Sequence, residues 1–494
     1  MTATRITRLR SAPRAAPVAV LIIALFAALL PLATPRVFAT DEVQYYVYLR
    51  SLRFDGDFDF ANDYQRFAEL NPRSGIERSL LAPDRIRPQT GLYGNIAPIG
   101  AAVLWAPFFF LADAGVQLAN ALGAQIAADG FSRPYIAAVG YASALYGLLG
   151  LLLCVRLARR YTDAFGAATT VITLWLASPL VYYMYIQMPF AHANGFFLAA
   201  LFTTIWIETR AARSVRAWAA LAVVGALLTM TREQYGLFLL LPAIDAIGHY
   251  ARHLRTGDRM AIGALLGRHV AFVTLFAAFL TPQLAVYQLL NGKPQPAGEV
   301  SGKLNLCSPH LIDVLVDFDP RPDWCVAPQD QVARTPAWSR GALLWTPVWL
   351  PALVGLVLLA KRDRGVAIAA IVTLGAQLWV DGAFGSTWHL TGAFGFRRLI
   401  ECTPLFVLGL APLVDAATRR TGRWPIAAAA GLLVAWNAGL VVNATVFNAE
   451  TRLRTGLTWP DLWRWQLEAP FKLMGKLGDL LFRRCAFFEN GRCE

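Results

Sequence analysis

Uncharged apolar stretches recur along the chain and are separated by short arginine-rich segments. Three of them, residues 15–34, 136–154 and 424–442, are mostly apolar and contain no charged residue. Each is at least about 18 residues long, which as an α-helix crosses the ~30 Å hydrocarbon core of a bilayer. Several such stretches in one chain predict an all-α polytopic membrane protein.

The basic residues between these stretches predict which span ends face the cytoplasm, because Lys and Arg accumulate on that side. The clusters are Arg156/Arg159/Arg160, Arg210/Arg213/Arg216, Arg252/Arg255/Arg259/Arg268, Lys361/Arg362/Arg364 and Arg419/Arg420/Arg423. Two spans lie between consecutive clusters: 165–184 with 189–208, 217–231 with 234–249, 265–290 with 341–360, and 366–384 with 399–416. With the first span, 134–155 and 425–446, about 11 transmembrane helices are expected.

The apolar segment 96–128 does not fit this alternation. A single crossing there would turn every later basic cluster outward, against the positive-inside rule. We therefore expect a re-entrant or interfacial helix pair on the outer side, broken by Pro98, Pro107 and Asp113. If 97–116 does cross, the count becomes 12.

The same pattern predicts two parts of the chain. Residues 1–446 form a transmembrane domain that includes a first outer loop at 40–95, the segment 96–128 and a second outer loop at 291–340. Residues 447–494 form a tail in which Trp, Phe and Leu alternate with Arg and Lys, as in amphipathic helices of the headgroup region.

Composition agrees with a membrane protein, since only 16% of the 494 residues are charged and 56% are hydrophobic. Soluble domains carry about a quarter charged residues. The net charge of +13 is explained by the cytoplasmic arginine clusters, so nucleic acid is not an expected partner. We expect a multi-pass protein of the cytoplasmic (inner) membrane.

The cysteines divide into two groups. Cys307 and Cys325 lie in the second outer loop and Cys485 and Cys493 in the tail, all on the oxidising side of the predicted topology. Both pairs are therefore candidate disulfides. No histidine–carboxylate spacing typical of zinc occurs, and neither a metal nor another cofactor is expected.

Asp41 and Glu42 directly follow the first span. One interpretation is structural: Thr40 caps a helix and the two acids favour its positive end. The other is catalytic: an ionised carboxylate held where the span meets outer water can accept a proton. The residues alone leave both interpretations open.

Three arginines lie at outer span ends, against the positive-inside bias. Arg397 and Arg398 precede a late span, and Arg232 lies between two short spans. Snorkelling at a span end is the structural explanation. Charges near membrane depth on the wrong side are also functional candidates, here for binding a phosphate.

Other polar residues accompany these arginines. Asp381, Trp388 and His389 share the outer loop with Arg397 and Arg398. His192 follows a tyrosine-rich span junction at 182–185 and is a candidate for an acceptor pocket, although interfacial aromatics are common there.

Three short motifs resemble those of GT-C glycosyltransferases, which include the protein O-mannosyltransferases and the aminoarabinose transferase of lipid A. They are Asp41-Glu42 followed by an amphipathic helix and Gly56-Asp57-Phe58-Asp59, then Gly91-Leu92-Tyr93-Gly94-Asn95-Ile96-Ala97-Pro98-Ile99-Gly100, then Phe394-Gly395-Phe396-Arg397-Arg398-Leu399. The resemblance implies transfer of a sugar from a polyprenyl-phosphate carrier to an acceptor hydroxyl on the non-cytoplasmic face, the periplasm or the exterior. The acceptor is a glycan, lipid or protein, and membrane lipid surrounds the enzyme.

The resemblance also implies roles for particular residues. Asp41 would be the general base and Glu42 a neighbour that orients or tunes it. Tyr93 joins the expected substrate pocket with His192, Asp381, Trp388 and His389. Many relatives carry a Pro-Pro pair or a Lys where this chain has Ala97-Pro98-Ile99-Gly100, so a cation there is absent or supplied by Arg85 or Arg87.

Two other functions remain open. A transporter or flippase of a lipid-linked saccharide would normally place ionisable residues inside its spans near the midplane. A surface-polysaccharide polymerase or ligase would use the second outer loop for catalysis and leave Asp41 without a role.

Overall fold

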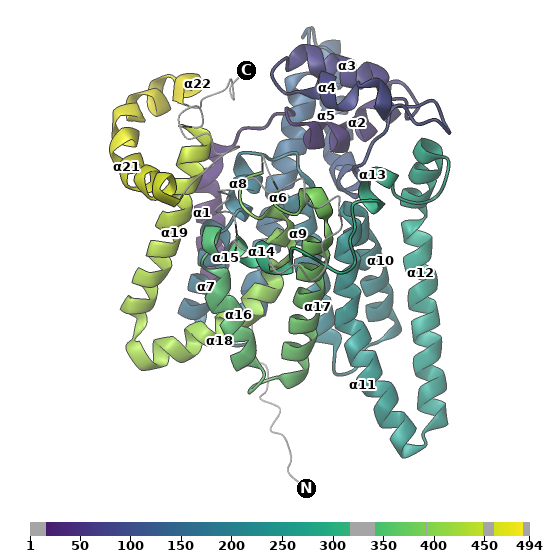
Figure 1. Cartoon of the computed structure of the whole chain (residues 1–494), viewed down its shortest axis with the longest axis vertical. Helices are drawn as coiled ribbons and strands as arrows, with labels where there is room; N and C mark the ends of the chain where they lie inside the picture. The colour runs from purple at the N-terminus through teal and green to yellow at the C-terminus, as the bar shows by residue number, and fades with distance from the viewer. Residues whose placement is uncertain (1–15, 317–340, 391–392, 448–458, 488–494) are drawn as a thin grey trace.

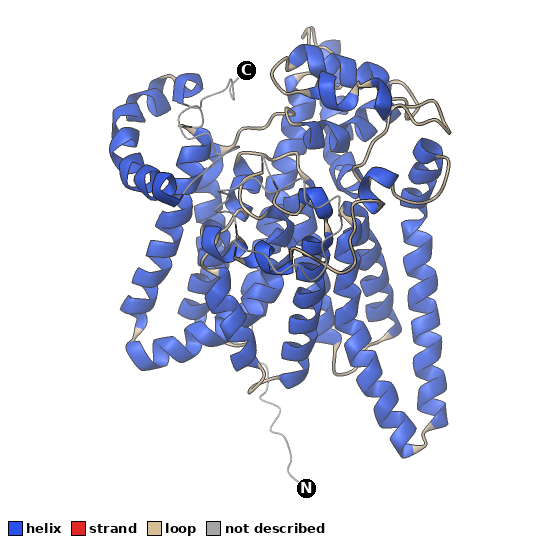
Figure 2. Cartoon of the chain, viewed as in Figure 1, coloured by secondary structure: helices blue, strands red, loops and turns tan. Residues whose placement is uncertain are grey.

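The computed structural model describes residues 16–316, 341–390, 393–447 and 459–487. Within these residues helices dominate, and the only extended pairings are two isolated bridges (Figure 2). The predicted all-α architecture is confirmed. In Figure 1 the long helices stand side by side, with α2, α3 and α21 at one end and the turn between α11 and α12 at the other.

Six helical segments are long and apolar enough to cross a bilayer, judged by length and composition. They are α5 (Gly100–Ala121), α6 (Arg133–Ala158), α12 (Arg259–Asn291), α17 (Arg364–Ala383), α18 (Thr403–Thr421) with the preceding 3₁₀ helix η7 (Arg397–Cys402), and α19 (Arg423–Thr445). Shorter apolar helices stand beside them: α1 with η2 (Ala16–Leu32), α7 (Ala164–Leu176), α10 (Val215–Thr231) and α16 (Trp349–Leu359). The chain is a multi-pass membrane protein, and the number of crossings stays a prediction.

Three further helices complete the predicted spans. They are α8 (Leu180–Tyr185), α9 (Ala191–Thr209) and α11 (Leu240–Thr256), the last preceded by the 3₁₀ helix η4 (Glu233–Leu239). The helices therefore break near the predicted outer ends of two spans, which is where Arg232 and His192 lie.

The segment expected to be a broken helix pair is instead one continuous helix, α5. The helix runs through Pro107 and Asp113, so the predicted breaks at those two residues are wrong. Asp113 does not need to leave the apolar helix, because Arg53 pairs with its carboxylate at 2.8 Å and the Tyr135 hydroxyl donates to it at 2.7 Å. Whether α5 crosses the membrane stays a prediction.

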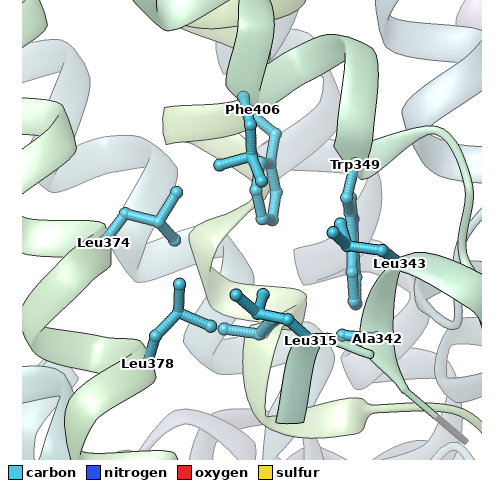
Figure 3. A pocket seen from close by; sticks show the side chains of 9 residues that line it. Leu315, Ala342, Leu343, Trp349, Leu374, Leu378 and Phe406 are labelled. Atoms are coloured by element: carbon cyan, nitrogen blue, oxygen red, sulfur yellow. The ribbon is translucent and has the colours of Figure 1, made fainter. Parts of the chain in front are cut away.

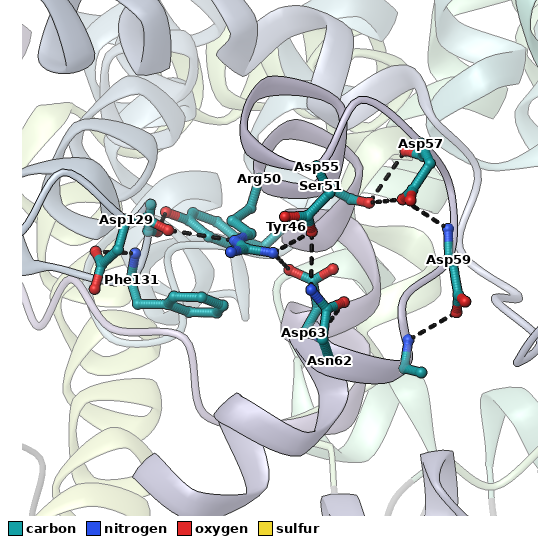
Figure 4. A network of polar contacts seen from close by, with 12 residues as sticks. Tyr46, Arg50, Ser51, Asp55, Asp57, Asp59, Asn62, Asp63, Asp129 and Phe131 are labelled. Carbon is teal, nitrogen blue, oxygen red and sulfur yellow. Dashed lines mark hydrogen bonds and ion pairs between the residues drawn. The ribbon is translucent and has the colours of Figure 1, made fainter.

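The first outer loop folds into three helices: α2 (Thr40–Phe54), α3 (Ala61–Leu70) and α4 (Ile76–Leu80). Figure 4 shows the polar network around Arg50 that joins α2 to α3. The Arg50 guanidinium pairs with Asp55, lies 3.4 Å from Asp63 and donates to the Asp129 carbonyl at 3.3 Å. One cation thus connects α2, α3 and the loop before α6, which fixes the outer assembly on the helices below.

Close glycine contacts determine where α18 and its 3₁₀ extension lie. A Cβ on Gly355 of α16 would be 1.9 Å from the Gly409 carbonyl oxygen of α18. A Cβ on Gly409 would in turn be 2.0 Å from the Ala352 carbonyl oxygen. Small residues let two apolar helices approach this closely. The contact anchors α18 and therefore η7, which carries Arg397 and Arg398.

The second outer loop contributes the short helices α13 (Gly298–Ser301) and α14 (Leu311–Leu315), and α15 (Ala342–Trp345) follows it. Cys307 is disulfide-bonded, which agrees with its prediction as a disulfide cysteine. Its predicted partner Cys325 and the tail residue Cys493 lie outside the described residues, so both pairings stay predictions.

The tail forms the long helix α21 (Trp459–Phe482), followed by α22 (Arg484–Phe487). Leu462 of α21 is buried, whereas Leu467, Phe471 and Met474 are exposed on the helix. The helix is therefore two-sided, and its predicted place in the headgroup region stays a prediction.

Candidate functional site

Glu42 caps the helix that carries Asp41. Its Oε2 accepts hydrogen bonds of 2.7 Å from the backbone N–H groups of Phe38 and Ala39, as the acid of a capping box does. Ala39, and not Thr40, is the N-cap residue, so the cap predicted for Thr40 is wrong. The two acids therefore differ in role: Glu42 holds the helix start, and the Asp41 carboxylate is left for other contacts.

The glycine-bounded motif of residues 91–100 holds α2 in place. The Asn95 amide donates to the Gln44 carbonyl at 2.8 Å, and the Ile96 N–H donates to the Gln44 side chain at 2.9 Å. One turn further along α2, the Tyr48 hydroxyl donates to the Ala97 carbonyl at 2.7 Å. The motif thus acts as a scaffold for the helix of Asp41.

Arg397 is the direct partner of Asp41. Its Nη2 lies 2.7 Å from Asp41 Oδ2, across 356 positions of the sequence. The guanidinium also lies over the Phe190 ring, 4.9 Å from the ring centre. Two residues predicted separately, one as a base and one as a phosphate ligand, are therefore in contact.

All three predicted arginines act on Asp41. Burial works to raise the pKa of Asp41, but the positive charges of Arg397, Arg232 and Arg398 outweigh it and lower that pKa below its ordinary value. Asp41 is therefore a carboxylate at neutral pH. Because Coulomb forces decline with distance, the shared effect means that the three guanidinium groups converge on one carboxylate.

The position of Arg232 follows from the contact between α5 and α10. A Cβ on Gly100 would be 2.4 Å from the Met230 carbonyl carbon, so the start of α5 packs on the end of α10. Arg232 follows α10 in an extended conformation (φ −162°, ψ 133°). Gly100, the last residue of the scaffold motif, thus places Arg232 beside α2.

Arg398 and Asp381 occupy the inner side of the same cluster. Arg398 is buried, donates to the Thr387 hydroxyl at 3.3 Å and lies 4.2 Å from the centre of the Phe384 ring. Asp381 is fully buried and accepts from the Gln234 amide at 3.3 Å. Asp381 lies in the last turn of α17, inside the predicted span 366–384, and not in the outer loop with which it was grouped.

His192 does join the cluster, through a residue that sequence reasoning missed. His192 Nδ1 lies 3.0 Å from Glu401 Oε1, and both side chains are fully buried. Arg232, Arg397 and Arg398 all act electrostatically on His192. A lone acid near the start of an apolar late span was the signal that could have identified Glu401.

Trp388 and His389 lie beside the second outer loop, where Trp388 contacts His310. The Trp388 ring stacks on His310 with centroids 4.7 Å apart, and His310 Nδ1 lies 3.1 Å from Asp313. The rings of Trp388 and His389 are 5.5 Å apart. His310 was not predicted.

Three other candidates have different surroundings. Tyr93 pairs with Ile86 in an isolated bridge, and within the described residues its hydroxyl forms no hydrogen bond to the arginine cluster. Arg85 and Arg87 both pair with Glu299, at 3.2 and 3.0 Å. These two arginines therefore join the first outer loop to the second.

A small apolar pocket lies among α14–α18 (Figure 3). Its lining consists of Leu315, Ala342, Leu343, Trp349, Leu353, Leu374, Leu378, Leu399 and Phe406. It presents a hydrophobic surface that cannot pair with a sugar hydroxyl or a phosphate. The candidate site is therefore the polar cluster around Asp41.

Some N–H donors of the arginines in this cluster are not used in hydrogen bonds. Among the pairs of its arginines with Asp41, Asp381 and Glu401, Asp41–Arg397 is the only ion pair within 4 Å. Among the residues that the structure describes, Arg397 Nε and Arg398 Nη1 are buried and have no hydrogen-bond partner. Buried cations with unused donors are suited to bind an anion with several oxygens, such as a phosphate. Within the described residues, no group of three or more His, Cys, Asp or Glu is arranged to hold a metal ion.

No protein-family model and no curated protein sequence matches the chain. Among solved structures it resembles ArnT from Cupriavidus metallidurans in the apo state, with 16% identity, a TM-score of 0.45, and coverage of 94% of this chain and 77% of that one. The same protein bound to undecaprenyl phosphate gives 16% identity, a TM-score of 0.47, and coverage of 94% and 78%. An apo oligosaccharyltransferase from Archaeoglobus fulgidus gives 13% identity, a TM-score of 0.41, and coverage of 94% and 55%. These scores describe a distant likeness in the arrangement of helices.

Proposed function

We propose that the chain is a membrane glycosyltransferase that moves a sugar from a polyprenyl-phosphate carrier to an acceptor hydroxyl on the outer face. The observation that carries this proposal is the convergence of three arginines on one ionised carboxylate, with a single direct ion pair among them. Such a site combines a proton acceptor with cations that can hold a departing phosphate.

The arginines bind the donor phosphate in this proposal. When the bond between the anomeric carbon and the phosphate oxygen breaks, its electron pair stays on the phosphate, which gains negative charge. Cations that are already in place stabilise that charge without reorganisation. Arg397, Arg398 and Arg232 supply them, and the unused donors on Arg397 and Arg398 face no competing partner.

Asp41 takes the proton of the acceptor. The acceptor oxygen forms a bond to the anomeric carbon, and its proton passes to the Asp41 carboxylate. In the free enzyme Arg397 holds the pKa of Asp41 low, which makes it a weak base. A bound donor phosphate accepts hydrogen bonds from Arg397 and thereby weakens the Asp41–Arg397 ion pair. The pKa of Asp41 then rises, so Asp41 becomes a better base only once the donor is present.

The test is transfer of radiolabel from a polyprenyl-phosphate sugar in membranes that contain the wild type, Asp41→Asn or Arg397→Ala. We expect Asp41→Asn to lower transfer by about a hundredfold or more, the scale of a lost general base. Arg66→Ala serves as the matched control, because Arg66 is an exposed outer arginine that pairs only with Glu69 on its own helix. It should leave transfer unchanged.

Binding of farnesyl phosphate, with farnesol as its uncharged control, separates the two roles. Asp41→Asn should keep or improve phosphate binding, because Arg397 loses a competing partner. Arg397→Ala should weaken it. Full transfer by Asp41→Asn would remove Asp41 as the base. Phosphate binding without transfer of any lipid-linked sugar would instead favour a carrier of lipid-linked saccharides.

A further inference from the structure

A buried histidine–glutamate pair connects the two elements that form the inner wall of the site. His192 lies in the first turn of α9 and Glu401 lies on η7, and their side chains meet at 3.0 Å with no exposure to solvent. The two residues are 209 positions apart in the sequence. The catalytic step proposed above does not use either of them.

Glu401 has a fixed geometric relation to the phosphate-binding arginines. In a 3₁₀ helix the side chains of residues i and i+3 eclipse each other. Arg398 and Glu401 stand in this relation on η7, so they project from the same side of it. Any rotation of η7 that moves Glu401 therefore moves Arg398 in the same direction, and Arg397 with it.

The surroundings of His192 keep its ring in one orientation. The ring stacks on Phe190 with a centroid distance of 5.9 Å and an angle of 13°, and it lies 4.7 Å from Tyr183. Phe190 is also the ring beneath the Arg397 guanidinium. Phe190 and Tyr183 thus aim His192 Nδ1 at Glu401.

Close packing leaves Glu401 little freedom. A Cβ on Gly195, one turn along α9 from His192, would be 2.9 Å from Glu401 Cγ and 3.0 Å from Glu401 Oε1. We assign the proton of the neutral ring to Nδ1, from which it is donated to Glu401 Oε1. His192 Nε2 is buried and has no hydrogen-bond partner in the described part of the chain. The bond at Nδ1 is therefore the polar contact through which His192 acts on η7.

We propose that His192 is a positioning residue that anchors Glu401 and thereby sets the direction of Arg397 and Arg398 toward the donor phosphate. The inference rests on the proposed function, since it assigns the arginines to phosphate binding. His192 itself does not touch the substrate.

Two conservative variants of His192 separate its two nitrogens. The amide nitrogen of Asn lies close to the position of Nδ1, whereas that of Gln lies close to the position of Nε2. His192→Asn should keep the bond to Glu401 and bind farnesyl phosphate within about threefold of the wild type. His192→Gln should lose that bond and bind about tenfold more weakly, the scale of one lost hydrogen bond to a charged group.

Variants of Glu401 test the other end of the same bond. Glu401→Gln still accepts from Nδ1 through its amide oxygen and should behave like His192→Asn. Glu401→Leu cannot accept and should behave like His192→Gln. In both disrupted variants we expect the donor KM to rise about tenfold with a smaller change in kcat, because phosphate binding is affected and the base is intact. The thermal transition of each purified variant shows whether it is folded.

The outcomes separate this inference from the proposed function. Farnesyl phosphate binding by the wild type that is equally strong in all four variants overturns the positioning role and leaves the proposed function standing. Equal weakening of His192→Asn and His192→Gln, with both folded, also overturns the role of the Nδ1 bond. A wild type that binds farnesyl phosphate no better than farnesol overturns both proposals.

Discussion

At opposite ends of α9 lie two clusters built from the same residue types, arginines and carboxylates that are buried or half-buried, but paired to different degrees. The helix has 19 residues, which separates its ends by about 28 Å. At its C-terminal end, Arg210 pairs with Asp245 at 2.7 Å and with Asp363 at 3.0 Å. Arg213 lies 3.5 Å from the same Asp245, and the Trp206 indole donates to it at 2.8 Å.

At its N-terminal end the pairing is incomplete. Arg397 has Asp41, but Arg398 and Arg232 form no ion pair within 4 Å with Asp381 or Glu401, although all of them act on one another electrostatically. In the C-terminal cluster the ion pairs join α9, α11 and α17. In the N-terminal cluster some guanidinium groups have no ion pair with these acids and can bind a ligand. A cluster in which each arginine has a carboxylate partner stabilises the fold. Buried hydrogen-bond donors without a partner in the protein instead indicate a site whose ligand supplies the acceptors.

The largest expected difference between the clusters is in activity. Arg397→Ala should lower sugar transfer by about 10²- to 10³-fold, the range for a lost donor to a developing negative charge. The transition temperature should change less than in Arg210→Ala, because the Asp41 side chain is 33% exposed and Arg232 and Arg398 still act on it. Initial rates of label transfer, with thermal melting of the same preparation, check this. A large drop in thermal stability would assign Arg397 to the structural kind of cluster.

Arg210→Ala should show the reverse behaviour. It leaves Asp245 and Asp363 with one fewer cation, which costs about 3 kcal/mol for a partly buried pair. We expect a lower transition temperature and an unchanged rate per folded molecule. If the rate fell as it does in Arg397→Ala while the protein stayed folded, the distinction between the clusters would be lost.

Asp63 of the outer network provides a third case, in which one cation is shared by two acids. Burial raises the pKa of Asp63 to about 7 despite the neighbouring Arg50. Its folded pKa exceeds its unfolded value, so its stabilising contribution is complete below about pH 4 and is lost as pH rises through 7. Thermal stability of the wild type should fall between pH 5 and 8.

Asp63→Asn should flatten this dependence and stabilise the protein at pH 8 by about 2 kcal/mol, roughly half of what a three-unit pKa difference allows. Asp41 has the opposite sign: its pKa is lowered, so its contribution is present above its unfolded pKa and lost only in stronger acid. Melting curves from pH 5 to 8 for both proteins measure the effect. A slope that persists in Asp63→Asn would exclude Asp63 as its source.

The smallest expected effect comes from Gly195→Ala. The added methyl group would displace Glu401 by a few tenths of an ångström, because it would lie 2.9 Å from Glu401 Cγ. Transfer should fall by about tenfold, with a modest loss of stability of about 1 kcal/mol. Gly375→Ala is the matched control, since a Cβ there meets nothing within 4 Å. Equal effects of the two substitutions would contradict a specific role for the contact with Glu401.

Several features of this fold could be predicted from local sequence. Apolar length and basic flanks located the helices, and the break before η7 fell next to Arg397 as the span boundary implied. The error at α5 came from treating Pro107 and Asp113 as breaks. Their effect depends on partners such as Arg53 that lie elsewhere in the chain.

The candidate site was predicted only in part, because its members come from four helical elements and from Arg232, which lies between α10 and η4. Asp41, Arg232 and the Arg397–Arg398 pair were identified by their positions at outer span ends. Glu401 was missed although a lone acid near the start of an apolar span is a signal, because its partner His192 lies 209 positions away in the sequence. Glu42 was grouped with Asp41, although its carboxylate caps the helix.

By itself the sequence determined that the chain forms apolar helices with charged ends, since burial in a bilayer is decided residue by residue. Only the tertiary structure decided which charges meet. The contact of Asp41 with Arg397 and that of His192 with Glu401 both join residues more than 200 positions apart. They depend on close helix packing, as at Gly355 with Gly409. Pairing between charges is a property of distance in space, and the order of residues along the chain does not specify it.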